Sequence, residues 1–273
     1  MRSFRSPRYF CVFLSMTVAA TMCAAHAAAP VPVKEAKVHV LIYHTFLGRE
    51  KIPTDFSIDQ FREQMLILKK NGFTFVSYAD VAQGRVSGDR NIMISIDDGN
   101  QTVYRAYHDV LKPLHIRPLL AIYPNIIGKR KYALTWEQLR ELAADGCDIA
   151  AHGFFHLHVN DKLYATNRRA FHDEIFKSKR VLEEKLNRKI TVFAYPSGEK
   201  SEKAEQMIRE AGYSYAFTIN WGVLRVPLSE NSNPYLLPRY MIEKQNWKSV
   251  FARLDGKSLK KVNGNGRKTI VRR

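Results

Sequence analysis

Residues 92–99 read Ile-Met-Ile-Ser-Ile-Asp-Asp-Gly, a short apolar run that ends in two adjacent carboxylates and a glycine. A run rich in Ile and Met, bounded by a turn signal, predicts a buried strand over 92–96. Asp-Asp-Gly alone is ordinary turn chemistry. At the end of a buried strand, however, two neighbouring carboxylates repel each other, and a divalent cation would offset that repulsion. The stretch therefore predicts a buried strand and a candidate metal site.

Further apolar runs alternate with helical segments on both sides of this strand. We expect the other strands at 37–43, 73–76, 119–122, 148–151, 190–195, 213–218 and 235–242. Capping boxes at Ser57 and Thr135 mark the starts of two intervening helices. Strands that alternate with helices favour a parallel sheet with helices outside it. Seven or eight repeats predict an α/β fold of one domain, with seven or eight mainly parallel strands closed into a barrel.

Polar or ring-bearing residues follow one predicted strand after another. They are His44, Asp97, Asp98, His152, His156, Tyr195, Pro196, Ser197 and Trp221, and the last predicted strand itself carries Arg239. In a (β/α) barrel the chemistry gathers at the carboxyl ends of the strands. We therefore expect these side chains to meet at one rim of the barrel.

Residues 152–156, His-Gly-Phe-Phe-His, are the most specific candidate ligands in the chain. Two histidines four residues apart on a helical turn face the same way and can share a metal ion. The alternative is a pair of surface histidines, and His158 leaves open which pair binds. A zinc-protease site is excluded, because that motif requires Glu where Gly153 stands. Two histidines with the Asp98 carboxylate suit one divalent ion, Zn²⁺ or else Co²⁺ or Ni²⁺.

These motifs, in this order, resemble the polysaccharide deacetylase family over about residues 38–239. Ser-Ile-Asp-Asp-Gly at 95–99 is similar to the family's Thr-Phe-Asp-Asp-Gly motif, and residues 152–156 are similar to its His-Ser/Thr-x-x-His motif. Residues 193–198 resemble a variant of its Arg-x-Pro-Tyr motif. The resemblance implies a distorted (β/α) barrel and the removal of N-acetyl or O-acetyl groups from glycans.

The resemblance also implies a role for each motif residue. Asp98, His152 and His156 would hold the metal, and Asp97 would act as general base. A backbone N–H near Ser197, in the segment with Tyr195 and Pro196, would stabilise the oxyanion. Tyr195 and Trp221 could stack on sugar rings, or they could simply pack in the core.

The sequence departs from the family pattern at several positions. Gly153 replaces the Ser or Thr that follows the first histidine, and Ala194 stands where the motif has Arg. The C-terminal Leu-x-His, which supplies the general acid, is absent. A branch that acts on the poly-N-acetylglucosamine of biofilms carries a Tyr-His dipeptide on its first strand, and Tyr43-His44 is similar to it. We therefore assign the acid role to His44, and Arg239 takes the place of the missing Arg beside Asp97.

The first 29 residues have the pattern of a secretory signal peptide. Three arginines precede an apolar run at 9–20, and Ala-His-Ala at 25–27 fits a signal-peptidase site. That apolar run is too short to span a bilayer. An uncleaved anchor and a lipoprotein attached at Cys23 are the alternatives. Export to the periplasm or the extracellular space is therefore expected, with residues 30–256 as the catalytic domain and no transmembrane segment after processing.

The formal net charge of +17 indicates attraction to anionic envelope surfaces. The basic residues of the chain are scattered and form no nucleic-acid motif, so we expect no nucleic-acid partner. Residues 257–273 are predicted to be a basic flexible tail. Once the signal is removed only Cys147 remains, which excludes an internal disulfide.

We therefore predict a metal-dependent hydrolase that deacetylates an envelope or extracellular polysaccharide. One alternative is a catalytically weakened glycan-binding protein on the same scaffold. Another is an acetyl-xylan-type esterase or an amidase acting on other C–N bonds, and a third is a basic protein that anchors through its tail.

Overall fold

The computed structural model describes residues 35–256. Its central strand is β3 (Gly88–Asp98), which includes the apolar run at 92–96, and every side chain from Asn91 to Asp97 is buried. The predicted signal peptide at 1–29 and the predicted tail at 257–273 lie outside the described residues. Among those described, the helices are all too short or too polar to cross a membrane.

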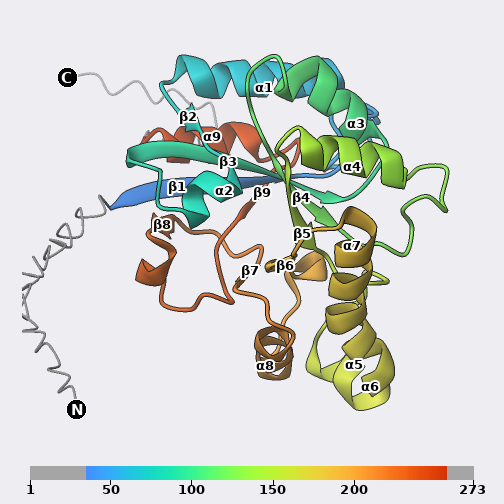
Figure 1. The fold of residues 1–273 in the computed structure, drawn as a ribbon. Helices are drawn as coiled ribbons and strands as arrows, with labels where there is room; N and C mark the ends of the chain where they lie inside the picture. The colour runs from blue at the N-terminus through green and yellow to red at the C-terminus, as the bar shows by residue number, and fades with distance from the viewer. Residues whose placement is uncertain (1–34, 257–273) are drawn as a thin grey trace, which may run out of the picture. The chain divides into compact units, whose positions relative to one another are not determined.

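The strands form one curled sheet around β3 (Figure 1). Its main path runs β7-β6-β5-β4-β3-β1-β8, with β2 paired to β3 and β9 paired to β1. The other strands are β1 (Ala36–Tyr43), β2 (Thr74–Phe75), β4 (Leu119–Ile122), β5 (Asp148–Ala151), β6 (Val192–Ala194), β7 (Tyr215–Phe217), β8 (Leu224–Val226) and β9 (Tyr240–Met241). Within residues 35–256 every strand pairing is parallel except that of β1 with β8.

The predicted count of seven or eight strands was too low, because residues 35–256 alone form a sheet of nine. The missed strand is β8, a three-residue run whose middle residue is an exposed arginine. Such a run carries too little periodicity to be identified from sequence, and its pairing with β1 forms only in the folded chain.

The predicted strand at 235–242 divides its pairing between the two edges of the curled sheet. Leu237 forms a parallel bridge to Phe217 of β7, whereas Tyr240 and Met241 pair with β1. The intervening residues therefore link the two edges and bring Arg239 to the inside of the curve. The expected distorted (β/α) barrel is confirmed.

Helices cover the outside of the sheet, and in Figure 1 α1, α3 and α4 lie along one side of it. The α-helices are α1 (Ile58–Lys70), α2 (Tyr78–Ala82), α3 (Thr102–Ala106), α4 (Trp136–Ala144), α5 (Asp161–Thr166), α6 (Arg168–His172), α7 (Ser178–Leu186), α8 (Glu202–Glu210) and α9 (Trp247–Leu254). Two π-helical turns, η1 (Tyr107–Leu111) and η2 (Asp173–Lys177), and two 3-10 turns, η3 (Pro196–Gly198) and η4 (Leu228–Glu230), complete the fold. The predicted capping boxes at Ser57 and Thr135 are both present.

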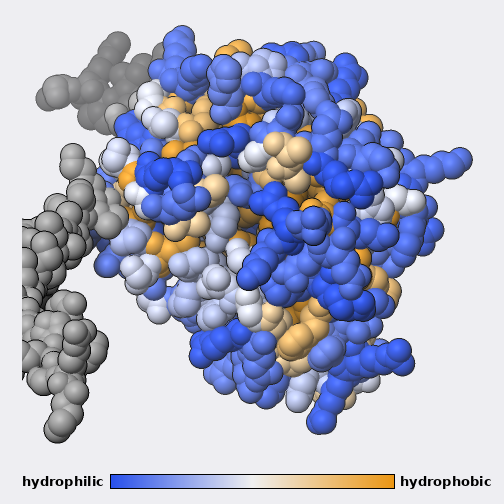
Figure 2. Space-filling model, viewed as in Figure 1, coloured by the Kyte–Doolittle hydropathy of each residue, from blue (hydrophilic) through white to orange (hydrophobic). Residues whose placement is uncertain are grey.

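Alternate residues of β3 face two different apolar cores. Ile92, Ile94 and Ile96 pack in the core shared with the helices, whereas Met93 belongs to the second core. Because strand side chains alternate between faces, Asp97 lies on the same side as Met93. Hydrophilic residues cover most of the face shown in Figure 2, with apolar ones between them.

Candidate active site

The carboxyl ends of β1, β3, β5 and β6 meet around one pocket of about 240 Å³. Parallel strands bring these ends to a common edge, as the barrel prediction required. The lining residues are His44, Asp97, Asp98, His152, His156, Tyr195, Ser197, Ile219 and Met241. Seven of these were predicted site residues, whereas Ile219 and Met241 were not.

The two adjacent carboxylates have different partners. Asp97 Oδ1 accepts hydrogen bonds from Arg239 Nη1 at 2.8 Å and from Ser95 Oγ at 3.0 Å. Asp98 has a left-handed backbone, with φ 78°, and its buried Oδ1 has no hydrogen-bond partner. That oxygen lies 3.3 Å from His156 Nε2 and 3.7 Å from His152 Nε2. Hydrogen bonds from Arg239 and Ser95 thus fix the Asp97 carboxylate, whereas the Asp98 carboxylate points toward the two imidazoles.

Asp98, His152 and His156 form a cluster whose potential ligand atoms all lie within 4.8 Å of one another. His152 Nδ1 contacts the Ala194 carbonyl oxygen at 2.8 Å. Since a carbonyl only accepts, Nδ1 carries the proton and the neutral ring keeps a lone pair on Nε2. Burial is the largest influence on His152 and lowers its pKa to about 4, against the opposing effect of Asp97 and Asp98. The three residues therefore fit a divalent first-row ion such as Zn²⁺.

The electrostatics of Asp97 keep it ionised. Burial opposes its charge, but the Arg239 guanidinium and, more weakly, His152 and His44 outweigh burial and hold the pKa of Asp97 at about 2. Arg239 is completely buried and also donates to Ser95 Oγ at 2.9 Å and to the Thr218 carbonyl at 2.9 Å. The guanidinium is therefore fixed on the inner side of Asp97, away from the pocket lining.

The expected helical turn between His152 and His156 was wrong, because residues 152–159 are neither helix nor strand. Gly153 and His156 both adopt left-handed backbone conformations, with φ 74° and 64°. The backbone amides of Phe154, Phe155 and Leu157 donate to the Glu174 carboxylate and not to carbonyls of a helix. The two histidines nevertheless converge, with 3.2 Å between their Nε2 atoms. His158, the other candidate, is exposed and outside the cluster.

The remaining predicted residues lie at different distances from the pocket. His44 lines it, and its buried Nδ1 has no hydrogen-bond partner. Tyr195 and Ser197 also line it, whereas Pro196 is buried and does not. Trp221 is 49% exposed and outside the lining, with its ring centroid 5.5 Å from that of Tyr240.

Sequence reasoning missed Glu174 and the role of Ser95. Glu174 lies in η2, completely buried, and burial raises its pKa to about 7 even though backbone N–H groups act in the opposite direction. A signal was available, because Glu174 stands three residues after Phe171, within the apolar stripe of a charged helical segment. An acid in such a stripe requires a buried partner.

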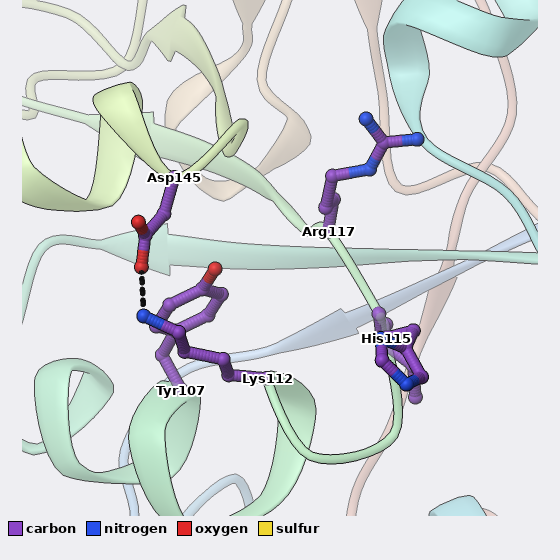
Figure 3. A pocket seen from close by; sticks show the side chains of 6 residues that line it. Tyr107, Lys112, His115, Arg117 and Asp145 are labelled. Carbon is purple, nitrogen blue, oxygen red and sulfur yellow. Dashed lines mark hydrogen bonds and ion pairs between the residues drawn. The ribbon is translucent and has the colours of Figure 1, made fainter.

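A second pocket, of about 360 Å³, lies near the amino ends of β4 and β5 (Figure 3). Its lining residues are Tyr107, Lys112, His115, Ile116, Arg117 and Asp145. Lys112 Nζ is paired with Asp145 Oδ2 at 2.6 Å, the contact drawn as a dashed line. This pocket therefore lies at the edge of the sheet opposite the predicted catalytic residues.

Comparisons with known proteins show which family and fold this chain is similar to. Residues 84–216 match the family model described as polysaccharide deacetylase. A poly-beta-1,6-N-acetyl-D-glucosamine N-deacetylase of Staphylococcus aureus (strain N315) is 23% identical over 225 residues, covering 77% of this chain and 76% of the relative.

Solved structures have the same fold. The structure of IcaB from Ammonifex degensii superposes with a TM-score of 0.70 at 26% identity, covering 80% of this chain and 97% of the other. Streptococcus pyogenes deacetylase PplD, solved with acetate, gives a TM-score of 0.67 at 19% identity over 80% and 98% of the two chains. The family model over residues 84–216, together with the curated relatives and the IcaB structure over 77–80% of the chain, supports the polysaccharide deacetylase family that the motifs resemble.

Proposed function

We propose that this chain is a metal-dependent N-deacetylase that acts on an exported, acetylated polysaccharide. The single observation that carries the proposal is the convergence of Asp98, His152 and His156 beside a separately held Asp97. A glycan-binding protein would have no need for an ionised carboxylate, fixed by a buried guanidinium, next to a metal site.

Each ligand has a defined place in this proposal. Asp98, His152 and His156 would hold one divalent ion, Zn²⁺ or else Co²⁺ or Ni²⁺. When bound, such an ion supplies a Lewis acid and makes water a nucleophile at neutral pH. The buried Asp98 oxygen without a hydrogen-bond partner supports this assignment.

The proton transfers are assigned to Asp97 and His44. Asp97, kept ionised by Arg239, takes the proton of the attacking water as general base. His44 lines the same pocket from the end of β1 and, when protonated, gives a proton to the departing amine. Arg239 orients Asp97, because its buried guanidinium contacts that carboxylate and lies outside the pocket lining.

Substrate contacts are assigned to the segment that follows β6 and to the rim. A backbone N–H near Ser197 stabilises the oxyanion, a contribution of about 3 kcal/mol for one donor. Ser197 has a left-handed backbone, with φ 55°, in the short turn η3 that also contains Pro196. Tyr195 lines the pocket, and exposed Trp221 offers a ring to a longer glycan.

The substrate class comes from the relatives. The Staphylococcus aureus relative is named for poly-beta-1,6-N-acetyl-D-glucosamine, and its similarity covers 77% of this chain. We propose an N-acetylglucosamine polymer as substrate, with residues 1–29 as a signal peptide that sends the enzyme to the periplasm or beyond. The formal net charge of +17 and the basic segment at 257–273 favour anionic envelope surfaces.

The decisive experiment is mass spectrometry of N-acetylglucosamine oligomers after incubation with the protein. Loss of acetyl groups is expected with Zn²⁺ present and should stop when a chelator is added. Asp97→Asn should keep the metal but lower turnover by roughly 100- to 10,000-fold. Full activity of Asp97→Asn would refute the base assignment, and release of acetate only from O-acetylated xylan would favour the esterase alternative.

A further inference from the structure

Glu174 is a buried acid whose hydrogen-bond partners belong to the loop that carries the two histidines. Its side chain is completely buried in η2. Its carboxylate accepts backbone N–H groups of Phe154 at 3.0 Å, Phe155 at 2.7 Å and Leu157 at 3.1 Å. Successive N–H groups that point at one anion form a nest, a recognised way to hold negative charge. We propose that Glu174 is a positioning residue that fixes this loop so that His152 and His156 can share a divalent cation.

Besides these bonds, the loop backbone is held at His152, whose N–H donates to the Ile122 carbonyl at 2.9 Å, and at the Phe154 and Val159 carbonyls, which accept at 3.3 Å each. Residues 152–159 belong to no helix or strand, so helical or ladder hydrogen bonds do not define their conformation. His156 has φ 64°, a left-handed backbone conformation that residues other than glycine rarely adopt. Because bonded amides lie on both sides of His156, the Glu174 carboxylate determines where this imidazole points.

Gly153 is the residue that admits this carboxylate. A Cβ at position 153 would lie 2.1 Å from Glu174 Oε2 and 3.1 Å from Pro196 Cγ. The first distance is far below van der Waals contact, so a side chain at 153 and the Glu174 carboxylate cannot occupy this space together. Glycine at 153, where the family motif has Ser or Thr, therefore leaves the space that the buried Glu174 carboxylate occupies.

The π-helical turn accounts for the position of Glu174 in the chain. Between α6 and α7, the segment Asp173–Lys177 widens the helix, and Glu174 and Ile175 are both buried there. Ser178 Oγ donates to the Glu174 carbonyl at 2.6 Å, which ties the widened turn to α7. Such insertions recur at functional sites because they turn a side chain away from the regular helical stripe.

Metal binding by the full chain tests the positioning role, which rests on the proposed function. Glu174→Gln keeps the shape of the side chain but offers an NH₂ group to amides that can only donate. Glu183→Gln is the matched control, because Glu183 on α7 also accepts a backbone N–H, from Ile190 at 2.9 Å, far along the chain from the histidines. Co²⁺ affinity and the visible spectrum of bound Co²⁺ are measured for the wild type and both variants.

The expected result is a loss of Co²⁺ affinity of about 10- to 100-fold for Glu174→Gln, with an altered spectrum, and little change for Glu183→Gln. Wild-type affinity and spectrum in a folded Glu174→Gln protein would overturn the positioning role. A wild-type protein that binds no Co²⁺ would instead refute the proposed metal site itself, so the two failures are distinguishable.

A second measurement needs no metal and applies even if Glu174→Gln folds poorly. In the metal-free wild type, Gly153→Ala should lower the melting temperature strongly, because the alanine Cβ clashes with the Glu174 carboxylate. In a Glu174→Ala protein the same substitution should lower the melting temperature less, because alanine at 174 leaves room for that Cβ. The strain of alanine at a left-handed position is common to both backgrounds and cancels in the cycle. Additive effects of the two substitutions would show that positions 153 and 174 are not coupled.

Discussion

Arg239 Nη1 donates a 2.8 Å hydrogen bond to Asp97 Oδ1, although 142 residues separate the two along the chain. Both side chains are buried, and Ser95 Oγ bonds to both of them. The contact exists because the segment carrying Arg239 links the two edges of the curled sheet, inside the end of β3. A buried carboxylate fixed in this way stays charged, because the guanidinium, with His152 and His44, outweighs the effect of burial on its pKa.

Replacing the guanidinium should therefore impair turnover without removing the metal. Arg239→Lys supplies one point charge in place of a planar fork. We expect kcat to fall about 100-fold, the effect of misplacing a reacting group by roughly 1 Å, with bound Zn²⁺ unchanged. Steady-state kinetics and metal analysis test this, with exposed Arg209→Lys on α8 as the control. Unchanged kcat would show that Asp97 does not depend on Arg239.

The contact between Arg239 and Asp97 should also contribute to the stability of the fold. Arg239→Met leaves the buried Asp97 charge without its cationic partner, which should cost about 3–5 kcal/mol of unfolding free energy. Adding Asp97→Asn removes that charge, so the double variant should be more stable than Arg239→Met alone. Urea denaturation of the three proteins measures both steps. A double variant that is less stable than Arg239→Met would contradict the argument.

Zinc should stabilise the folded chain through His156 and not through His158. At a free concentration of about 100 times its Kd, a bound ion adds about 2.7 kcal/mol to the unfolding free energy. His156→Ala should abolish this gain, because its Nε2 belongs to the cluster with Asp98 and His152. His158→Ala, an exposed histidine on the same loop, is the matched control. Thermal denaturation with and without chelator measures the gain, and its loss in His158→Ala instead would reverse the assignment.

The general-acid role of His44 predicts a dependence on the leaving group. An amine needs a proton to depart, whereas p-nitrophenolate does not. His44→Gln should therefore lower the hydrolysis of N-acetyl groups by roughly 100-fold and leave p-nitrophenyl acetate hydrolysis nearly unchanged. His39→Gln, on β1 ahead of His44 but outside the pocket lining, should affect neither reaction. Equal losses on both substrates would remove His44 from the acid role.

Stability of the metal-free protein should depend on pH through His152. Its folded pKa is lowered, mainly by burial, from 6.5 to about 4, so the unfolded chain binds more protons between these values. The contribution of neutral His152 to the unfolding free energy is therefore fully present above pH 6.5. It is lost as the pH falls toward 4, by about 3 kcal/mol in total. Urea denaturation across this range in the presence of chelator measures the slope. His152→Gln should flatten it, and a slope of the opposite sign would contradict the burial argument.

Exposed Trp221 provides a test of the extended glycan contact. Trp221→Ala should raise KM for long N-acetylglucosamine oligomers several-fold and leave kcat for the shortest substrate unchanged, because stacking is lost at a distance from the reacting bond. Leu66→Ala on α1 is the control, since Leu66 is a similarly exposed apolar residue, at 47%. A wild-type KM for long oligomers in Trp221→Ala would mean that this ring only packs against Tyr240.

Local sequence patterns were sufficient for the scaffold and for the position of the rim. The run at 92–96 and the similar runs around it predicted strands that the structure contains, although several have shorter bounds. Polar residues after β1, β3, β5 and β6 were expected at one edge, and they line one pocket. The helical turn expected for His152 and His156 was wrong, because Glu174 offered the loop amides a better acceptor than their own backbone.

The sequence by itself determined all the described strands except β8, the starts of the capped helices and the chemical identity of the carboxylate and imidazole groups, because these depend on periodicity and on neighbours a few residues away. Only the tertiary structure decided that Glu174 enters the space left by Gly153 and that Ser95 bonds to both Asp97 and Arg239. Those contacts join residues from separate elements. Their energies depend on burial and on the direction of each hydrogen bond, and both exist only once the sheet has curled and its helices have packed.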